Sequence, residues 1–114
     1  MSTAPDSEAA VVAAIVLTTL AADADAATLA HTLVEERLAA CVSILPVMTS
    51  VYRWGGAVEE AREQQLVIKT PVARLGALEA RLRELHPYEV PEFLVIRADG
   101  GSEVYLRWLG ASAS

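Results

Sequence analysis

The sequence has little of what redox, zinc and nucleic-acid sites require. Its 114 residues include one cysteine, Cys41, and two histidines. A single cysteine cannot form an internal disulfide, and the sequence has no CxxC pair of the kind that redox and zinc sites use. Fifteen acidic residues oppose nine basic ones, for a formal net charge of −6. Nucleic acid and anionic membranes bind clustered Lys and Arg, so neither is an expected partner.

Catalytic motifs and long apolar segments are also missing. There is no GxSxG, HExxH, Walker A or GxGxxG motif, so no enzyme class is indicated. The apolar run at residues 9–17 is shorter than the ~20 residues of a membrane helix. The residues before it include Asp6 and Glu8 and no Lys or Arg, unlike the positive start of a secretory signal. Together with the single cysteine, these features predict a cytoplasmic protein.

The length fits one domain, which we place at residues 11–112 after a flexible N-terminal tail at residues 1–10. The apolar fraction is 54%, whereas about 45–50% is usual for soluble domains. This surplus suggests additional buried surface, such as a subunit interface.

Hydrophobic patterning predicts alternating strands and helices. Residues 11–19 form a short β-branched run, typical of a strand covered on both faces. Residues 26–38 have apolar positions at helical spacing after Asp25, a suitable N-cap. Residues 42–54, interrupted at Pro46, and 58–70 are predicted to form a hairpin around Gly55-Gly56.

The second half of the chain repeats the pattern. Leu75, Leu78, Leu82 and Leu85 predict an amphipathic helix that ends before Pro87. Residues 93–97 predict another short strand, and residues 103–109 are compatible with a terminal helix or strand. The order is β-α-β-β-α-β, which is an α+β fold of the ferredoxin-like split βαβ sandwich type.

The predicted hairpin is longer than the domain that carries it. Thirteen residues at 42–54 span about 43 Å when extended, whereas a compact chain of this size is roughly 34 Å across. Tyr52 and Trp54 lie near the tip, where they would be unfavourable in water. A neighbouring subunit is the simplest way to cover them.

The densest group of reactive side chains lies at residues 86–92, between a helix and a strand. His86, Tyr88, Glu89 and Glu92 are held there between prolines. Such a segment could preorganise an imidazole with carboxylate partners, as a base or a metal ligand. A rigid connector explains it better than catalysis does, and weak metal binding by His86 and Glu89 stays open.

Other polar residues have simpler interpretations. Cys41 lies in an apolar stretch and is expected to be a packed, structural thiol. His31 is expected to be solvated on its helix. Lys69, the only lysine, follows an apolar run and is expected to reach solvent or pair with a buried carboxylate. A solvated hairpin face is expected for Glu59, Glu60, Arg62 and Glu63.

Several segments, in order, resemble the signature blocks of the CutA family of divalent-ion tolerance proteins. The resemblance extends over about residues 11–110. The matching segments are 18–19 (TT), 33–42 (LVEERLAACV), 50–54 (SVYRW), 68–70 (IKT), 86–92 (HPYEVPE) and 105–108 (YLRW).

The resemblance implies a ferredoxin-like protomer with a C-terminal helix, packed as a homotrimer like the nitrogen-regulatory PII proteins. It implies tolerance of divalent metals, copper especially, and no known reaction or required cofactor. Some members carry a cysteine and a second histidine as copper ligands where this chain has Thr18 and Leu85. Of that set His86 is retained, so copper or another divalent cation is expected to bind weakly.

Two alternatives remain. A PII-like regulatory or scaffold trimer would bind a small anion or a protein in its inter-subunit clefts, where Lys69 and Arg53 would matter. An enzyme using His86 with Glu89 or Glu92 ranks below it. The candidates for the inter-subunit cleft are Cys41, Tyr52, Arg53, Trp54, Lys69, Tyr88 and Glu92.

Overall fold

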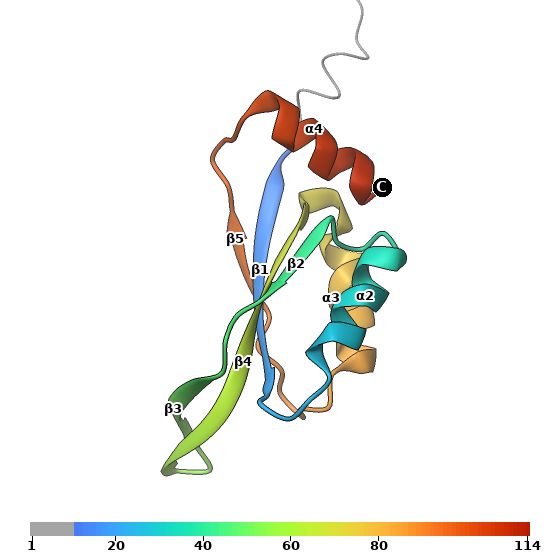
Figure 1. The fold of residues 1–114 in the computed structure, drawn as a ribbon. Helices are drawn as coiled ribbons and strands as arrows, with labels where there is room; N and C mark the ends of the chain where they lie inside the picture. The colour runs from blue at the N-terminus through green and yellow to red at the C-terminus, as the bar shows by residue number, and fades with distance from the viewer. Residues whose placement is uncertain (1–10) are drawn as a thin grey trace, which may run out of the picture.

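The computed structural model describes residues 11–114 as one antiparallel sheet with two helices on one face (Figure 1). A third helix lies across one end of the sheet. This arrangement confirms the predicted α+β order. The elements are β1 (Ala13–Ala21), α2 (Ala26–Glu35), β2 (Cys41–Ile44), β3 (Met48–Trp54), β4 (Ala57–Pro71), a 3₁₀ turn (Val72–Arg74), α3 (Leu75–Leu85), β5 (Leu94–Arg97) and α4 (Glu103–Ser112).

The sheet has the strand order β2-β4-β1-β5, and β3 pairs with β4 beyond the end of β2. The central pair, β1 and β4, runs antiparallel from Ala13 opposite Pro71 to Ala21 opposite Glu63. Pro46 lies between β2 and β3, as expected for a residue that removes a ladder donor. The two short strands β2 and β5 therefore form the edges of the body of the sheet.

The core lies between the sheet and the helices α2 and α3. It contains Val16, Leu66 and Ile68 from the sheet and Leu33 and Leu78 from the helices, all fully buried. The other face of β1, predicted to be covered as well, is buried at Ala13 and Thr19 near the two ends of the strand. Ile15 and Leu17, on the other face, are only half-buried.

Helix α2 begins where the sequence predicts and ends three residues early. The Asp25 carboxylate accepts a hydrogen bond from the Thr28 backbone N–H (3.1 Å), which caps the first turn. Arg37 then adopts a left-handed conformation with φ 60°. This conformation ends the helix and lets Leu38 donate to the Leu33 carbonyl at 3.0 Å.

The terminal segment is a helix, α4, which settles the open choice between helix and strand. Ser102 caps it by accepting a hydrogen bond from the Tyr105 N–H at 3.2 Å. At its other end the Arg37 guanidinium donates to the carbonyls of Ala111 (2.7 Å) and Ser114 (3.3 Å). Arg37 thus links the end of α2 to the end of α4.

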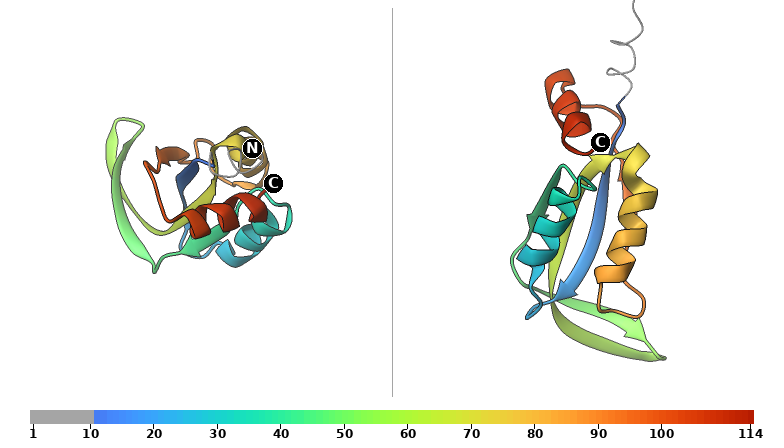
Figure 2. Two further views of the ribbon diagram at one scale, coloured as in Figure 1. Left: turned by 90° about the horizontal axis from the view of Figure 1, so that it is seen from above. Right: turned by 90° about the vertical axis from the view of Figure 1, so that its right-hand side faces the viewer.

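The β3–β4 hairpin projects beyond the body of the domain (Figures 1 and 2). Gly55 and Gly56 form its turn with φ 60° and 82°, values that a two-residue hairpin turn of this type requires. The chain is elongated, at 59 × 25 × 24 Å. Strand β4 has 15 residues, whereas the predicted strand at 42–54 is divided into β2 and β3 around residues 45–47. Within the single chain, Trp54 is 53% exposed and Tyr52 43%.

The face of the sheet opposite the helices is apolar and open. The register places Leu94 and Val67 on either side of Leu17, and Ile96 opposite Ile15. Helices α2 and α3 lie on the other side of the sheet (Figure 2), and all four residues of β5 are exposed. The domain therefore presents an uncovered apolar surface together with two strand edges.

Candidate functional site

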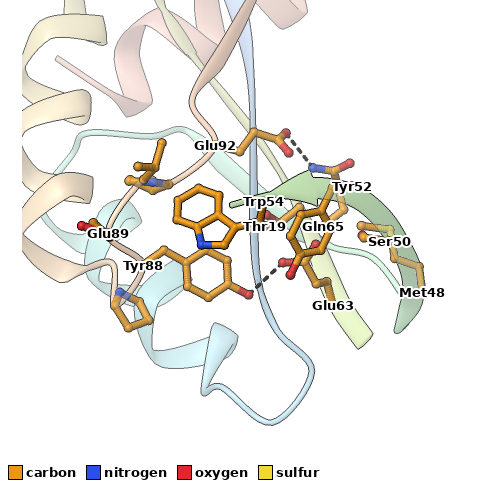
Figure 3. Close-up of a pocket in the computed structure, with 13 residues that line it drawn as sticks. Thr19, Met48, Ser50, Tyr52, Trp54, Glu63, Gln65, Tyr88, Glu89 and Glu92 are labelled. Atoms are coloured by element: carbon orange, nitrogen blue, oxygen red, sulfur yellow. Dashed lines mark hydrogen bonds between the residues drawn. The ribbon is translucent and has the colours of Figure 1, made fainter. Parts of the chain in front are cut away.

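A pocket of about 780 Å³ lies between the inner face of the hairpin and the loop after α3 (Figure 3). Its walls come from four segments that are distant in the sequence. They are Thr19 of β1, Met48, Ser50, Tyr52 and Trp54 of β3, Glu63 and Gln65 of β4, and residues 87–92 of the loop.

Strand alternation explains which side chains face this pocket. In β3 the lining residues are every second one, from Met48 to Trp54, because alternate side chains of a strand share a face. The register places Met48 directly opposite Glu63, so Glu63 lies on the same face of the hairpin. Arg53, one residue out of phase, lies on the opposite face.

His86 fixes the start of the loop. It is 7% exposed, its Nε2 lies 2.7 Å from the Thr19 carbonyl, and the Tyr88 backbone N–H donates to its Nδ1 at 3.1 Å. Because Nδ1 accepts, the bonding pattern assigns the ring proton to Nε2, which donates to Thr19. Both ring nitrogens are therefore engaged in holding the loop against β1.

Tyr88 joins the loop to the hairpin. Its hydroxyl donates to the Glu63 carboxylate at 2.8 Å, as drawn in Figure 3. Burial, and then the hydrogen bond and charge of Glu63, raise the pKa of Tyr88 to about 12. The phenol therefore stays protonated and acts as a permanent donor to Glu63 at neutral pH.

Glu63 corrects the prediction of a wholly solvated hairpin face. Glu59 and Glu60 are exposed as expected, but Glu63 is only 8% exposed. The strand pattern places Glu63 on a face of the hairpin but does not show that the loop folds back over it. This buried carboxylate is the pocket residue that sequence reasoning missed most clearly.

Gln65 positions a second acid. Its side-chain amide donates to the Thr18 carbonyl at 3.0 Å and to the Glu92 carboxylate at 3.1 Å. No Lys or Arg lines the pocket. The four ion pairs among residues 11–114 involve neither Glu63 nor Glu92. The charged groups of the pocket are thus all acidic and lack a basic partner within the described chain.

The structure divides the predicted site residues into two groups. Five of them line the pocket: Tyr52, Trp54, Tyr88, Glu89 and Glu92.

The other candidates lie elsewhere. Cys41 and Lys69 are cross-strand partners in β2 and β4, on the open face of the sheet, and Cys41 is half-buried rather than fully packed as expected. His31 is exposed, as expected. No ion pair of Lys69 occurs among residues 11–114.

The residues present do not form a ready metal centre. In the described chain, no group of three or more His, Cys, Asp and Glu side chains could hold a metal ion. His86 has both nitrogens engaged, and Glu89 is exposed on the loop. At Thr18 the hydroxyl is buried without a hydrogen-bond partner, and its neighbours do not supply a metal-ligand set.

No helix within residues 11–114 has the length and apolar character to cross a membrane.

Comparison with known proteins gives one consistent result. Residues 14–112 match the family model described as CutA1 divalent ion tolerance protein. A divalent-cation tolerance protein CutA from Pectobacterium atrosepticum is 45% identical over 100 residues, which is 88% of this chain and 91% of that protein. The CutA of Thermus thermophilus is 46% identical over 95 residues, covering 83% of this chain and 92% of the relative.

Solved structures agree with the sequence relatives. The divalent cation tolerance protein of Thermus thermophilus aligns with a TM-score of 0.85 at 43% identity, over 90% of this chain and 99% of its own. CutA1 of Oryza sativa aligns with a TM-score of 0.87 at 38% identity, over 91% and 95%. The fold is therefore shared with proteins from a bacterium and a plant.

Proposed function

The chain belongs to the CutA1 divalent ion tolerance family, and from this membership we propose that it acts as a homotrimer that binds divalent cations weakly. Tolerance of divalent cations is the function for which the relatives are named. The proposal includes no catalytic step. It places the protein in the cytoplasm, because the half-buried thiol of Cys41 suits a reducing compartment.

The apolar surface left uncovered by one chain supports the trimer, and it is the observation that carries the proposal. A closed ring needs two different surfaces that fit each other, and the edges β2 and β5 supply such a pair. Pairing the β2 side of one subunit with β5 of the next would satisfy both edges. The open face that carries Leu17 and Leu94 would then turn toward the centre of the ring.

Weak cation binding follows from the state of His86. A metal ion at this imidazole would have to replace one of its two hydrogen bonds, to Thr19 or to Tyr88. Leaving a buried polar group without its partner costs about 1–3 kcal/mol, which lowers the affinity. Glu89 would supply an oxygen ligand, and copper is the expected preference because it heads the affinity order at nitrogen sites.

Two measurements test the proposal. Light scattering should give the mass of three 12.1 kDa chains, and a single-chain mass at micromolar concentration would refute the trimer. A copper titration should show micromolar binding that His86→Gln weakens at least tenfold, while His31→Gln leaves it unchanged. Glutamine keeps a donor for the Thr19 carbonyl, which is one of the two hydrogen bonds by which His86 holds the loop. Equal losses in the two variants would show adventitious surface binding.

The alternative of a small-anion site in this pocket has little support. Its lining contains Glu63, Glu89 and Glu92 and no basic residue. Arg53 lies on the other face of the hairpin, where its guanidinium is 3.5 Å from the Gly56 carbonyl. Lys69 lies on the open face of the sheet. An anion would meet only like charge in the pocket of one chain.

A further inference from the structure

We propose that the pocket between the hairpin and residues 87–92 binds a small organic cation, specifically a short alkyl diammonium ion. This ligand class goes beyond tolerance of metal ions. The inference does not depend on copper binding. It places the ligand in the cleft for which Tyr52, Trp54, Tyr88 and Glu92 are the candidates, and this chain contributes the acidic and aromatic side chains there.

The charge of the pocket calls for a cation. Glu63 is 8% exposed, and the Tyr88 hydroxyl is the only hydrogen-bond donor that it meets among residues 11–114. A buried carboxylate without a positive partner is unfavourable, because burial removes the water that stabilised its charge. Glu92 likewise receives only the Gln65 amide in the described chain. Both acids retain acceptor capacity for ammonium N–H groups.

The walls favour an organic cation over a bare metal ion. Trp54, Tyr52 and Tyr88 bring three aromatic rings to the lining. Aromatic faces attract ammonium groups and also pack against methylene chains. Met48 and Pro91 extend the apolar wall. A strongly hydrated metal ion would gain nothing from such walls, whereas an alkylammonium ion has both the charge and the apolar surface to use them.

The spacing of the acids indicates two positive groups. Glu63 and Gln65 lie two residues apart on one face of β4, a step of about 7 Å, and the Gln65 amide holds Glu92 beside it. Among the described residues, no group of three or more His, Cys, Asp and Glu side chains could hold a metal ion. A diammonium ion with about four methylenes between its nitrogens has a length comparable to this two-residue step of about 7 Å along β4.

The test uses 1,4-diaminobutane as the probe and Trp54 as the reporter. The chain has two tryptophans, so Trp108→Phe leaves Trp54 as the only indole. Titration with the diamine should change Trp54 fluorescence with saturation at one molecule per chain. Butylamine should bind at least fivefold more weakly, and 1,4-butanediol should not bind. Calorimetry on the parent protein should give the same stoichiometry.

A matched pair of variants locates the site. Glu63→Gln should weaken diamine binding at least tenfold, while Glu60→Gln, which removes the same charge from an exposed position of the same strand, should leave it unchanged. Glu92→Gln provides a second variant in case Glu63→Gln fails to fold. Diamine binding is measured without added metal, and copper binding without diamine, so failure of this inference is distinguishable from failure of the metal proposal. Equal losses from Glu63→Gln and Glu60→Gln, binding of the diol, or no saturable binding would each overturn the inference.

Discussion

The two halves of β4 differ in how far the rest of the chain covers them. In the inner half Leu66, Ile68 and Thr70 have no exposed surface, whereas Val58 in the outer half is 65% exposed. The inner half lies between β1 and β2 beneath two helices, while the outer half pairs only with β3. The body is therefore stabilised by its own core. The hairpin, as a two-stranded ribbon, depends on what contacts it.

The largest expected effect is in the body. Leu66→Ala removes a fully buried side chain and should lower the free energy of unfolding by about 2–5 kcal/mol, because it leaves a cavity among packed neighbours. Urea denaturation measures this loss. Val58→Ala in the outer half of the same strand should change it by less than about 0.5 kcal/mol. A large decrease in the free energy of unfolding for Val58→Ala would show that another chain covers the hairpin.

Trp54→Ala tests how much the hairpin contributes to stability and to assembly. With half of its surface exposed in one chain, its removal should cost roughly 1–2 kcal/mol from intrachain contacts alone. Complete burial by a neighbouring subunit would raise the cost to about 3–5 kcal/mol and cause partial dissociation. Thermal denaturation and mass measured together distinguish the two cases. An unchanged melting temperature and mass would mean that the indole contributes to neither.

Substitutions at Arg37 test its contacts with the C-terminal end of α4. Arg37→Ala removes the hydrogen bonds to the carbonyls of Ala111 in α4 and of Ser114 just beyond it and should cost about 1–2 kcal/mol. Arg37→Gly loses the same bonds, but it also relieves the left-handed backbone at φ 60°, which glycine adopts without strain. We therefore expect Gly to be more stable than Ala by roughly 1 kcal/mol in urea denaturation. The opposite order would contradict this account.

The smallest expected effect concerns Tyr88, which joins the loop at residues 87–92 to the β3–β4 hairpin. Its pKa is raised to about 12 in the folded protein, against about 10 for an unperturbed tyrosine. The unfolded chain therefore loses this proton first. The stabilisation is complete below about pH 10 and decreases as pH rises from there through 12. Tyr88→Phe should flatten this alkaline decrease in unfolding free energy. Ultraviolet titration of the phenolate should show one late-titrating tyrosine that the variant lacks.

Local patterns predicted most of the elements. The helical spacing of Leu78 and Leu82, the turn at Gly55-Gly56 and the interruption at Pro46 depend on neighbouring residues, and the structure has all three features. The end of α2 was missed because nothing in the pattern indicates that Arg37 adopts a positive φ.

The site was predictable only in part, because it depends on contacts between distant segments. Residues 86–92 were identified by their composition, and Tyr52 and Trp54 by their position near the hairpin tip. The burial of Glu63 depends on the Tyr88 hydroxyl, which lies 25 residues away in the sequence. No local pattern reports that contact. Cys41 looked packed because its sequence neighbours are apolar, but its strand is at the edge of the sheet.

The exposed strand β5 has a consequence for folding and solubility. Leu94, Val95 and Ile96 form an apolar stretch with high β-propensity on an unpaired edge, which is the kind of segment that nucleates aggregation. Pro91 before it and Arg97 at its end are gatekeepers, because a proline and a charge interrupt the growth of stacked strands. The stretch is also only four residues long. The protein thus has an apolar strand edge that can pair with another chain, but the edge is short. Its short length restricts uncontrolled self-association while the protein folds.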